Sequence, residues 1–310
     1  MLDQACQKIL EFDYGNKEIG EALRNYAQTT LPRVLPIFPT LIRLSCEAVG
    51  GKPEKTKNVA TAMTLITASG DIHDDIIDNS THKFQKKTIF GRYGKEIALL
   101  AGDTLLIQGI ALLNKCDDLS VEQKSNIIDL IAKSMFEMVK AEAFETMLRK
   151  KNKVTVGEYF ETIKLKGSVA ELQCRIGGII GCADVEDLDN LAHYGRVVGI
   201  LSTMKEEFVD LQNISELRHR IESELAPYPV IFALQDKTLD EQIGWLLLKK
   251  DLSRKDLQFI ANKVIKSEMA QKLKYELSAL GQKELEENRL LKEDTCKEAA
   301  IILKVLAAEM

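Results

Sequence analysis

Two short acidic runs have a spacing that could bind metal ions. Each places carboxylates at positions i, i+1 and i+4, so on a helix the first and third lie on one face. The members are Asp74, Asp75 and Asp78 in the first run and Glu206, Glu207 and Asp210 in the second. Such crowded carboxylates repel one another unless they face water or hold cations. Either run alone could be a solvated surface, but two copies ending apolar segments favour an Mg²⁺ site.

A diphosphate is the ligand that suits this kind of site. Mg²⁺ uses few carboxylates and completes its octahedral shell with water and phosphate oxygens. Ionised carboxylates cannot bind an anion directly, so bridging cations and nearby basic side chains must reverse the local charge. The candidate basic residues are Lys83, Lys86, Lys87 and Lys166.

The elements that must position these residues are helices. No proline occurs between Pro53 and Pro227, and a proline-free stretch of this length favours long helices. Apolar residues recur there at intervals of three and four, and alternating strand patterns are absent. The sequence therefore predicts an all-α fold, a single large helical bundle formed by one domain over residues 1–310. We expect ten or more helices, with Asp74 and Glu206 on different helices facing one cavity.

Composition narrows the class of protein. The 310 residues are 45% hydrophobic and 29% charged, as in ordinary globular proteins. A net charge of −5 gives no overall attraction to nucleic acid, which we exclude as a partner. No run of about 18 uncharged apolar residues is present, and the N-terminus lacks the plan of a secretion signal. We therefore expect a cytoplasmic protein that is not transmembrane.

The ordered series of motifs resembles the trans-polyprenyl diphosphate synthases, which have the class I isoprenoid-synthase fold. The first run matches the family's DDxxD motif, the second lies at its second aspartate-rich motif, and Lys166 falls on the lysine of its Lys-Thr pair. Lys83 takes the place of an arginine that follows the first motif. The resemblance implies that Asp74, Asp75, Asp78 and Lys166 are catalytic, that Lys83 and Lys166 bind an allylic prenyl diphosphate, and that all six acidic residues bind Mg²⁺.

The departures from the family lie where it holds its acceptor, isopentenyl diphosphate. Leu35, Phe38, Thr67 and Phe84 replace a lysine, an arginine, a histidine and an arginine. Each lost contact is worth roughly 1.5–3 kcal/mol, so the acceptor should bind far more weakly. Asp71 stands where the family has an apolar residue, and is either an ordinary helix-stripe residue or a base that serves a new acceptor.

The resemblance leaves three functions open. The main prediction is a prenyltransferase-type enzyme that ionises a long allylic prenyl diphosphate and passes the cation to a non-standard, unknown acceptor or cyclises it. The alternatives are ordinary elongation with isopentenyl diphosphate and a non-catalytic partner subunit of a homologous synthase. The family also implies a homodimer or, in the third case, a heteromer.

The prenyl chain length is expected to depend on the residues just before the first motif. In the family, side chains four and five positions upstream form the floor of the pocket for the prenyl tail. Ser69 and Gly70 occupy these positions, and their small size predicts room for a long tail. The alternative is that a neighbouring helix fills the space.

Overall fold

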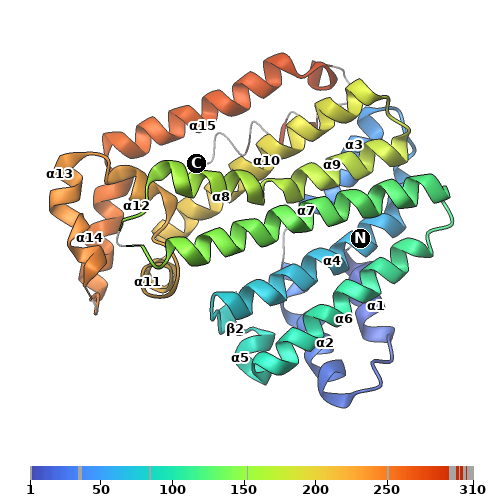
Figure 1. The fold of residues 1–310 in the computed structure, drawn as a ribbon, viewed down its shortest axis with the longest axis horizontal. Helices are drawn as coiled ribbons and strands as arrows, with labels where there is room; N and C mark the ends of the chain where they lie inside the picture. The colour runs from blue at the N-terminus through green and yellow to red at the C-terminus, as the bar shows by residue number, and fades with distance from the viewer. Residues whose placement is uncertain are drawn as a thin grey trace. The chain divides into compact units, whose positions relative to one another are not determined.

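The structure, a computed structural model, describes residues 2–33, 37–83, 85–151, 153–249, 251–292, 298–299, 301–302 and 305. In this part of the chain it contains fifteen α-helices and one two-stranded hairpin (Figure 1). The predicted all-α class and the expectation of ten or more helices are therefore confirmed. The hairpin pairs His82 with Lys87 and Lys83 with Lys86 in antiparallel register, a small element that the sequence did not reveal.

Contacts within the chain group it into two compact units. Unit 1 comprises Met1–Ile128 and Ile176–Ala183, and unit 2 comprises Asp129–Arg175 and Asp184–Met310. Two helices, α7 (Val121–Leu148) and α9 (Ser168–Gly181), have residues in both. The single domain over residues 1–310 stays a prediction, and each unit is described by itself.

The elements of unit 1 come mainly from the N-terminal part of the chain. They are α1 (Leu2–Glu11), α2 (Lys17–Thr29), α3 (Ile37–Ala48), α4 (Thr56–Ile77), β1 (His82–Lys83), β2 (Lys86–Lys87), α5 (Ile89–Tyr93) and α6 (Lys95–Asn114). Short 3₁₀ turns lie at Leu31–Arg33 and Pro53–Lys55.

Close packing of α4 against α6 positions the first acidic run. A Cβ atom on Gly102 would lie 2.3 Å from His73 Nε2, and one on Gly109 would lie 2.6 Å from Ile66 Cγ1. These two glycines lie seven residues apart on α6, so they open one face of that helix for α4. The polar end of α4 is thereby held on a rigid helix pair.

Helix α6 is long enough and apolar enough to cross a membrane. It is the one helix in the described part of the chain that meets these two criteria. One third of its most apolar window is buried within the structure. Core helices of globular proteins pass the same test, and α6 packs along α4 as a core helix does. The helix is therefore weak evidence for a membrane span.

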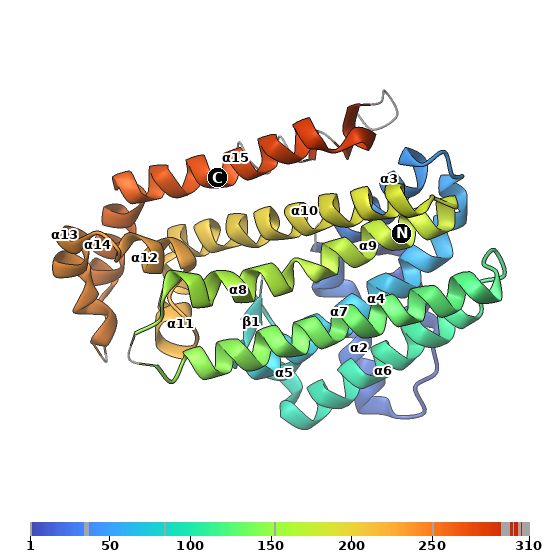
Figure 2. The same cartoon turned by 45° about the horizontal axis from the view of Figure 1, so that its top comes forward.

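Unit 2 contains the remaining helices. They are α8 (Val156–Lys166), α10 (Val185–Gln212), α11 (Ile214–Ser223), α12 (Tyr228–Ala233), α13 (Lys237–Leu239), α14 (Arg254–Ile265) and α15 (Glu268–Glu287). Short 3₁₀ or π turns lie at Asp240–Gly244, Leu246–Leu248 and Arg289–Lys292. Figure 2 shows α15 running alongside α10, the long helix that carries the second acidic run.

Helix ends in unit 2 are set by local sequence. Thr155 and Glu158 form a capping box that starts α8, and that helix ends at Gly167. A Cβ atom on Gly199 of α10 would lie only 2.7 Å from Gly167 Cα, so α10 passes directly over this junction between α8 and α9. Lys166 is thereby held at a fixed point against α10.

Candidate functional site

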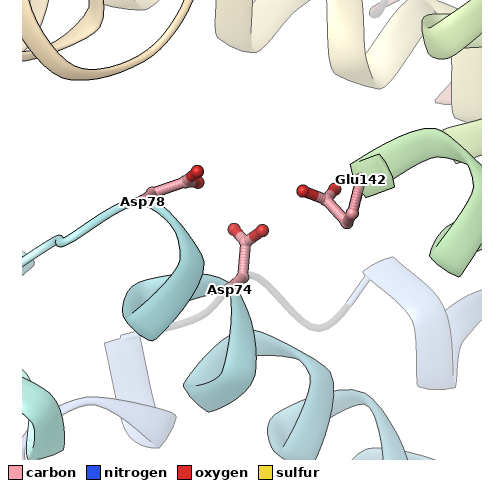
Figure 3. A group of neighbouring side chains, drawn as sticks. All are labelled: Asp74, Asp78 and Glu142. Atoms are coloured by element: carbon pink, nitrogen blue, oxygen red, sulfur yellow. The ribbon is translucent and has the colours of Figure 1, made fainter. Parts of the chain in front are cut away.

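The first acidic run lies at the C-terminal end of α4. Asp74 is in the last turn of the helix, and Asp78 is the residue that caps it. Each offers a carboxylate oxygen, and these two oxygens lie within 4.8 Å of each other (Figure 3). Two carboxylates at this separation fit a divalent cation with oxygen ligands.

Asp75 has a different environment from its two neighbours. Its residue surface is 6% exposed, and it does not belong to the group of oxygens that Asp74 and Asp78 form. Burial is the main reason that the pKa of Asp75 is raised to about 7. The positive charge of Lys83 lowers this pKa, and the negative charge of Asp71 raises it further. Its role as a metal ligand stays a prediction.

Asp71 joins three elements of unit 1 through its carboxylate. The hydroxyl of Tyr26 on α2 donates to Asp71 Oδ2 at 3.1 Å, and the ammonium of Lys83 on β1 pairs with Oδ1. Burial lowers the pKa of Lys83, but the carboxylates of Asp71 and Asp75 outweigh it and raise the pKa overall. Asp71 is thus a structural partner of Lys83, a contact that neither interpretation of Asp71 from the sequence included.

The expected acceptor pocket is only partly described. The hydroxyl of Thr67 donates to the backbone oxygens of Met63 (3.0 Å) and Thr64 (3.2 Å) on its own helix. Phe38 is half-buried on α3. Leu35 and Phe84 lie outside the described residues, so the loss of the acceptor contacts stays a prediction.

Ser69 and Gly70 differ in exposure although they are adjacent. Ser69 is buried, whereas Gly70 is exposed and has no atom within 4 Å of the place where a Cβ would stand. The open space beside Gly70 is compatible with a tail pocket that depends on this position.

Lys166 is paired with two glutamates within unit 2. Its Nζ lies 2.9 Å from Glu145 Oε2 and 3.1 Å from Glu142 Oε1, both carried by α7. Burial raises the pKa of Glu145, and Lys166 opposes that rise. Sequence reasoning missed these two glutamates, although an acidic pair at i and i+3 in an apolar helix was a usable signal.

The second acidic run is split between solvent and the interior of unit 2. Glu206 is exposed, Glu207 is buried, and Asp210 is half-buried. The guanidinium of Arg220 on α11 donates to Asp210 Oδ2 at 2.6 Å and to Glu207 Oε1 at 3.0 Å. Burial raises the pKa of Asp210 to about 7, with Arg220 opposing and Glu207 adding to the rise.

Arg220 was not among the residues singled out from the sequence. It lies thirteen positions after Glu207, on another helix, and no local pattern links the two. The expectation that all three acidic residues hold Mg²⁺ stays a prediction.

Comparison with known proteins places the chain in a family. The sequence pattern of the Polyprenyl synthetase family matches residues 27–264. The chain belongs to this family. The predicted family is therefore confirmed.

Two curated relatives are similar over part of the chain. A geranylgeranyl diphosphate synthase of Methanosarcina mazei is 28% identical over 184 residues, which cover 59% of this chain and 56% of that protein. A short chain isoprenyl diphosphate synthase of Methanothermobacter thermautotrophicus is 28% identical over 181 residues, which cover 58% of this chain and 55% of that protein. The matches thus span little more than half the length of these relatives.

The fold also matches solved structures. The geranylgeranyl pyrophosphate synthetase from Pyrococcus horikoshii superposes with a TM-score of 0.84 at 23% identity, covering 99% of this chain and 94% of that one. The isoprenoid-synthase type of helical bundle is therefore confirmed.

Proposed function

We propose that this protein is a Mg²⁺-dependent prenyl diphosphate synthase that lengthens an allylic prenyl diphosphate with isopentenyl diphosphate. The observation that carries the proposal is the pairing of Asp74 and Asp78 at the end of α4, where two carboxylate oxygens lie within 4.8 Å. The synthases named above favour elongation over the non-standard acceptor, which was the main prediction from the sequence.

The residues present fit the metal at the first motif. Asp74 and Asp78 would hold it, and bound Mg²⁺ would neutralise the charge of the departing diphosphate. Lys166 and Lys83 are the proposed basic contacts of the same diphosphate. Both ammonium groups are paired with carboxylates, so binding the substrate requires that they exchange or share these partners.

A second candidate is transfer to a non-standard acceptor, or cyclisation. It is favoured by Thr67, whose hydroxyl donates to its own helix, and by Phe38, which has no charge to offer a phosphate. The degraded acceptor site, including Leu35 and Phe84, belongs to this candidate.

The experiment that separates these functions uses purified protein, Mg²⁺ and allylic diphosphates of ten to twenty-five carbons. Released diphosphate and lipid products are measured with and without isopentenyl diphosphate. Elongated products would support the first proposal, and diphosphate release without elongation would support the second. No turnover until a homologous subunit is added would favour the third function, a non-catalytic partner subunit.

We further propose that the protein forms a homodimer through apolar helix faces. In unit 1, α6 exposes Leu99, Leu100, Ile107 and Ile110, whose positions around the helix lie within about one quadrant. Exposed apolar side chains gathered on one face are typical of association sites. A heteromer with a homologous subunit and a cytoplasmic location remain predictions.

A further inference from the structure

The buried carboxylate of Glu207 accepts hydrogen bonds from three groups of unit 2. The Tyr159 hydroxyl lies 3.1 Å from both oxygens, and Arg220 Nη2 lies 3.0 and 3.2 Å from them. The backbone N–H of Tyr228 donates to Oε2 at 2.6 Å. A carboxylate has about four lone-pair positions, and these three donors occupy most of them.

Arg220 is in turn surrounded by three carboxylates. Besides Glu207, it contacts Asp210 through Nη1 at 2.6 Å and Glu224 through Nε at 3.0 Å. The Nε also donates to the backbone oxygen of Leu225 at 3.1 Å. The guanidinium is permanently charged and planar, and its fixed fork of donors suits several carboxylates at once.

Because these groups are buried, a metal ion could not easily replace the guanidinium between the carboxylates. Arg220 is 9% exposed and Glu207 is 6% exposed. A metal ion could bind Glu207 and Asp210 only if the guanidinium left, and that would strand a buried charge. Among the residues that the structure describes, the second acidic run does not bring three ligand atoms within 4.8 Å of one another.

We propose that the guanidinium of Arg220 takes the place of a metal ion between Glu207 and Asp210. Glu207 and Asp210 are then positioning residues that tie α10 to α11 and to the start of α12, and divalent cations bind at the first acidic run. This inference rests on the proposed function, since it refines which of that function's acidic residues hold metal.

The test counts the Mn²⁺ ions bound per chain in the presence of saturating inorganic diphosphate, by electron paramagnetic resonance of the free ion. Asp210→Asn should bind as many ions as the wild type, with dissociation constants within about twofold. Asp74→Asn should lose at least one ion or bind at least tenfold more weakly. A loss in Asp210→Asn equal to that in Asp74→Asn would overturn the inference.

A second measurement does not depend on the first motif. In Arg220→Gln the three carboxylates lose their cation, so Mn²⁺ alone should raise the unfolding temperature of this variant more than that of the wild type. Arg218→Gln, which removes an exposed arginine of α11 paired with Glu222, is the matched control and should respond like the wild type. An Arg220→Gln chain that folds but responds to Mn²⁺ no more than the control would contradict the inference.

The two failures can be told apart. If the wild type binds no Mn²⁺ with diphosphate, the proposed function fails at Asp74 and Asp78. The inference then depends on whether Mn²⁺ stabilises Arg220→Gln. If Arg220→Gln does not fold, the comparison of Asp210→Asn with the wild type decides it.

Discussion

Asp74 and Asp78 differ from Asp75 in what surrounds them, although the three belong to one motif. We expect Asp74→Asn or Asp78→Asn to lower Mg²⁺-dependent diphosphate release by about two to three orders of magnitude, the usual effect of losing one charge-stabilising group. The assay is diphosphate release from an allylic substrate, with circular dichroism to confirm the fold. Asp118→Asn, an exposed aspartate before α7, is the control and should be fully active. Full activity in Asp74→Asn would show that the first run is not the metal site.

Asp210 makes the stability of the protein depend on pH. Its pKa is about 7 in the folded state against a usual 3.8, so between these values the folded state binds more protons than the unfolded state. The free energy of unfolding should therefore fall as pH rises from about 4 to 7 and level off above 7. For this one group the fall is at most on the order of 4 kcal/mol.

Asp210→Asn should remove this contribution and flatten the profile. Urea unfolding at pH 4.5, 6 and 7.5, with a chelator present, measures the difference between the variant and the wild type. Parallel profiles for the two proteins would mean that Asp210 titrates near its ordinary pKa.

At the level of elements, the carboxylate of Asp71 links the β1–β2 hairpin and α2 to α4. Asp71→Asn should lower the free energy of unfolding by roughly 1–3 kcal/mol and speed amide exchange in residues 82–87, because Lys83 loses its charged partner. Tyr26→Phe removes only the hydroxyl contact and should leave exchange in the hairpin unchanged. Equal exchange in Asp71→Asn and the wild type would show that the hairpin does not depend on this ion pair.

The junction between α8 and α9 depends on close approach of α10. Gly199→Ala should cost roughly 1–3 kcal/mol, since the new Cβ would lie 2.7 Å from Gly167 Cα, an atom of the backbone. Gly157→Ala in the first turn of α8 is the matched control. Its Cβ meets no atom within 4 Å, so it should be neutral or stabilise by up to about 1 kcal/mol. Chemical unfolding of both variants tests the contrast, and equal costs would contradict it.

At the level of the whole molecule, the exposed apolar face of α6 should decide the oligomeric state. Ile107 is 67% exposed, and Ile107→Glu should shift the proposed dimer towards monomer by placing a charge in an apolar interface. Light scattering at micromolar concentrations measures the shift. Tyr275→Glu on α15, where the side chain is 76% exposed, controls for a surface charge elsewhere. A wild type that is already monomeric would exclude the dimer.

The sequence by itself determined the helical class and the first acidic run as a carboxylate pair. Both depend on short-range periodicity, because residues four apart share a helix face wherever the helix lies. The family was expected from a different feature, the resemblance of an ordered series of short motifs to those of the trans-polyprenyl diphosphate synthases.

Only the tertiary structure decided the partners of the remaining charged residues. Each pair joins residues from separate helices that lie far apart in the sequence. Arg220 contacts Glu207 across 13 positions, Lys166 contacts Glu142 across 24, and Tyr26 contacts Asp71 across 45. No periodic pattern encodes such pairings. They arise because burial forces each charged or polar group to find a partner, and the packing of the helices determines which partner is within reach.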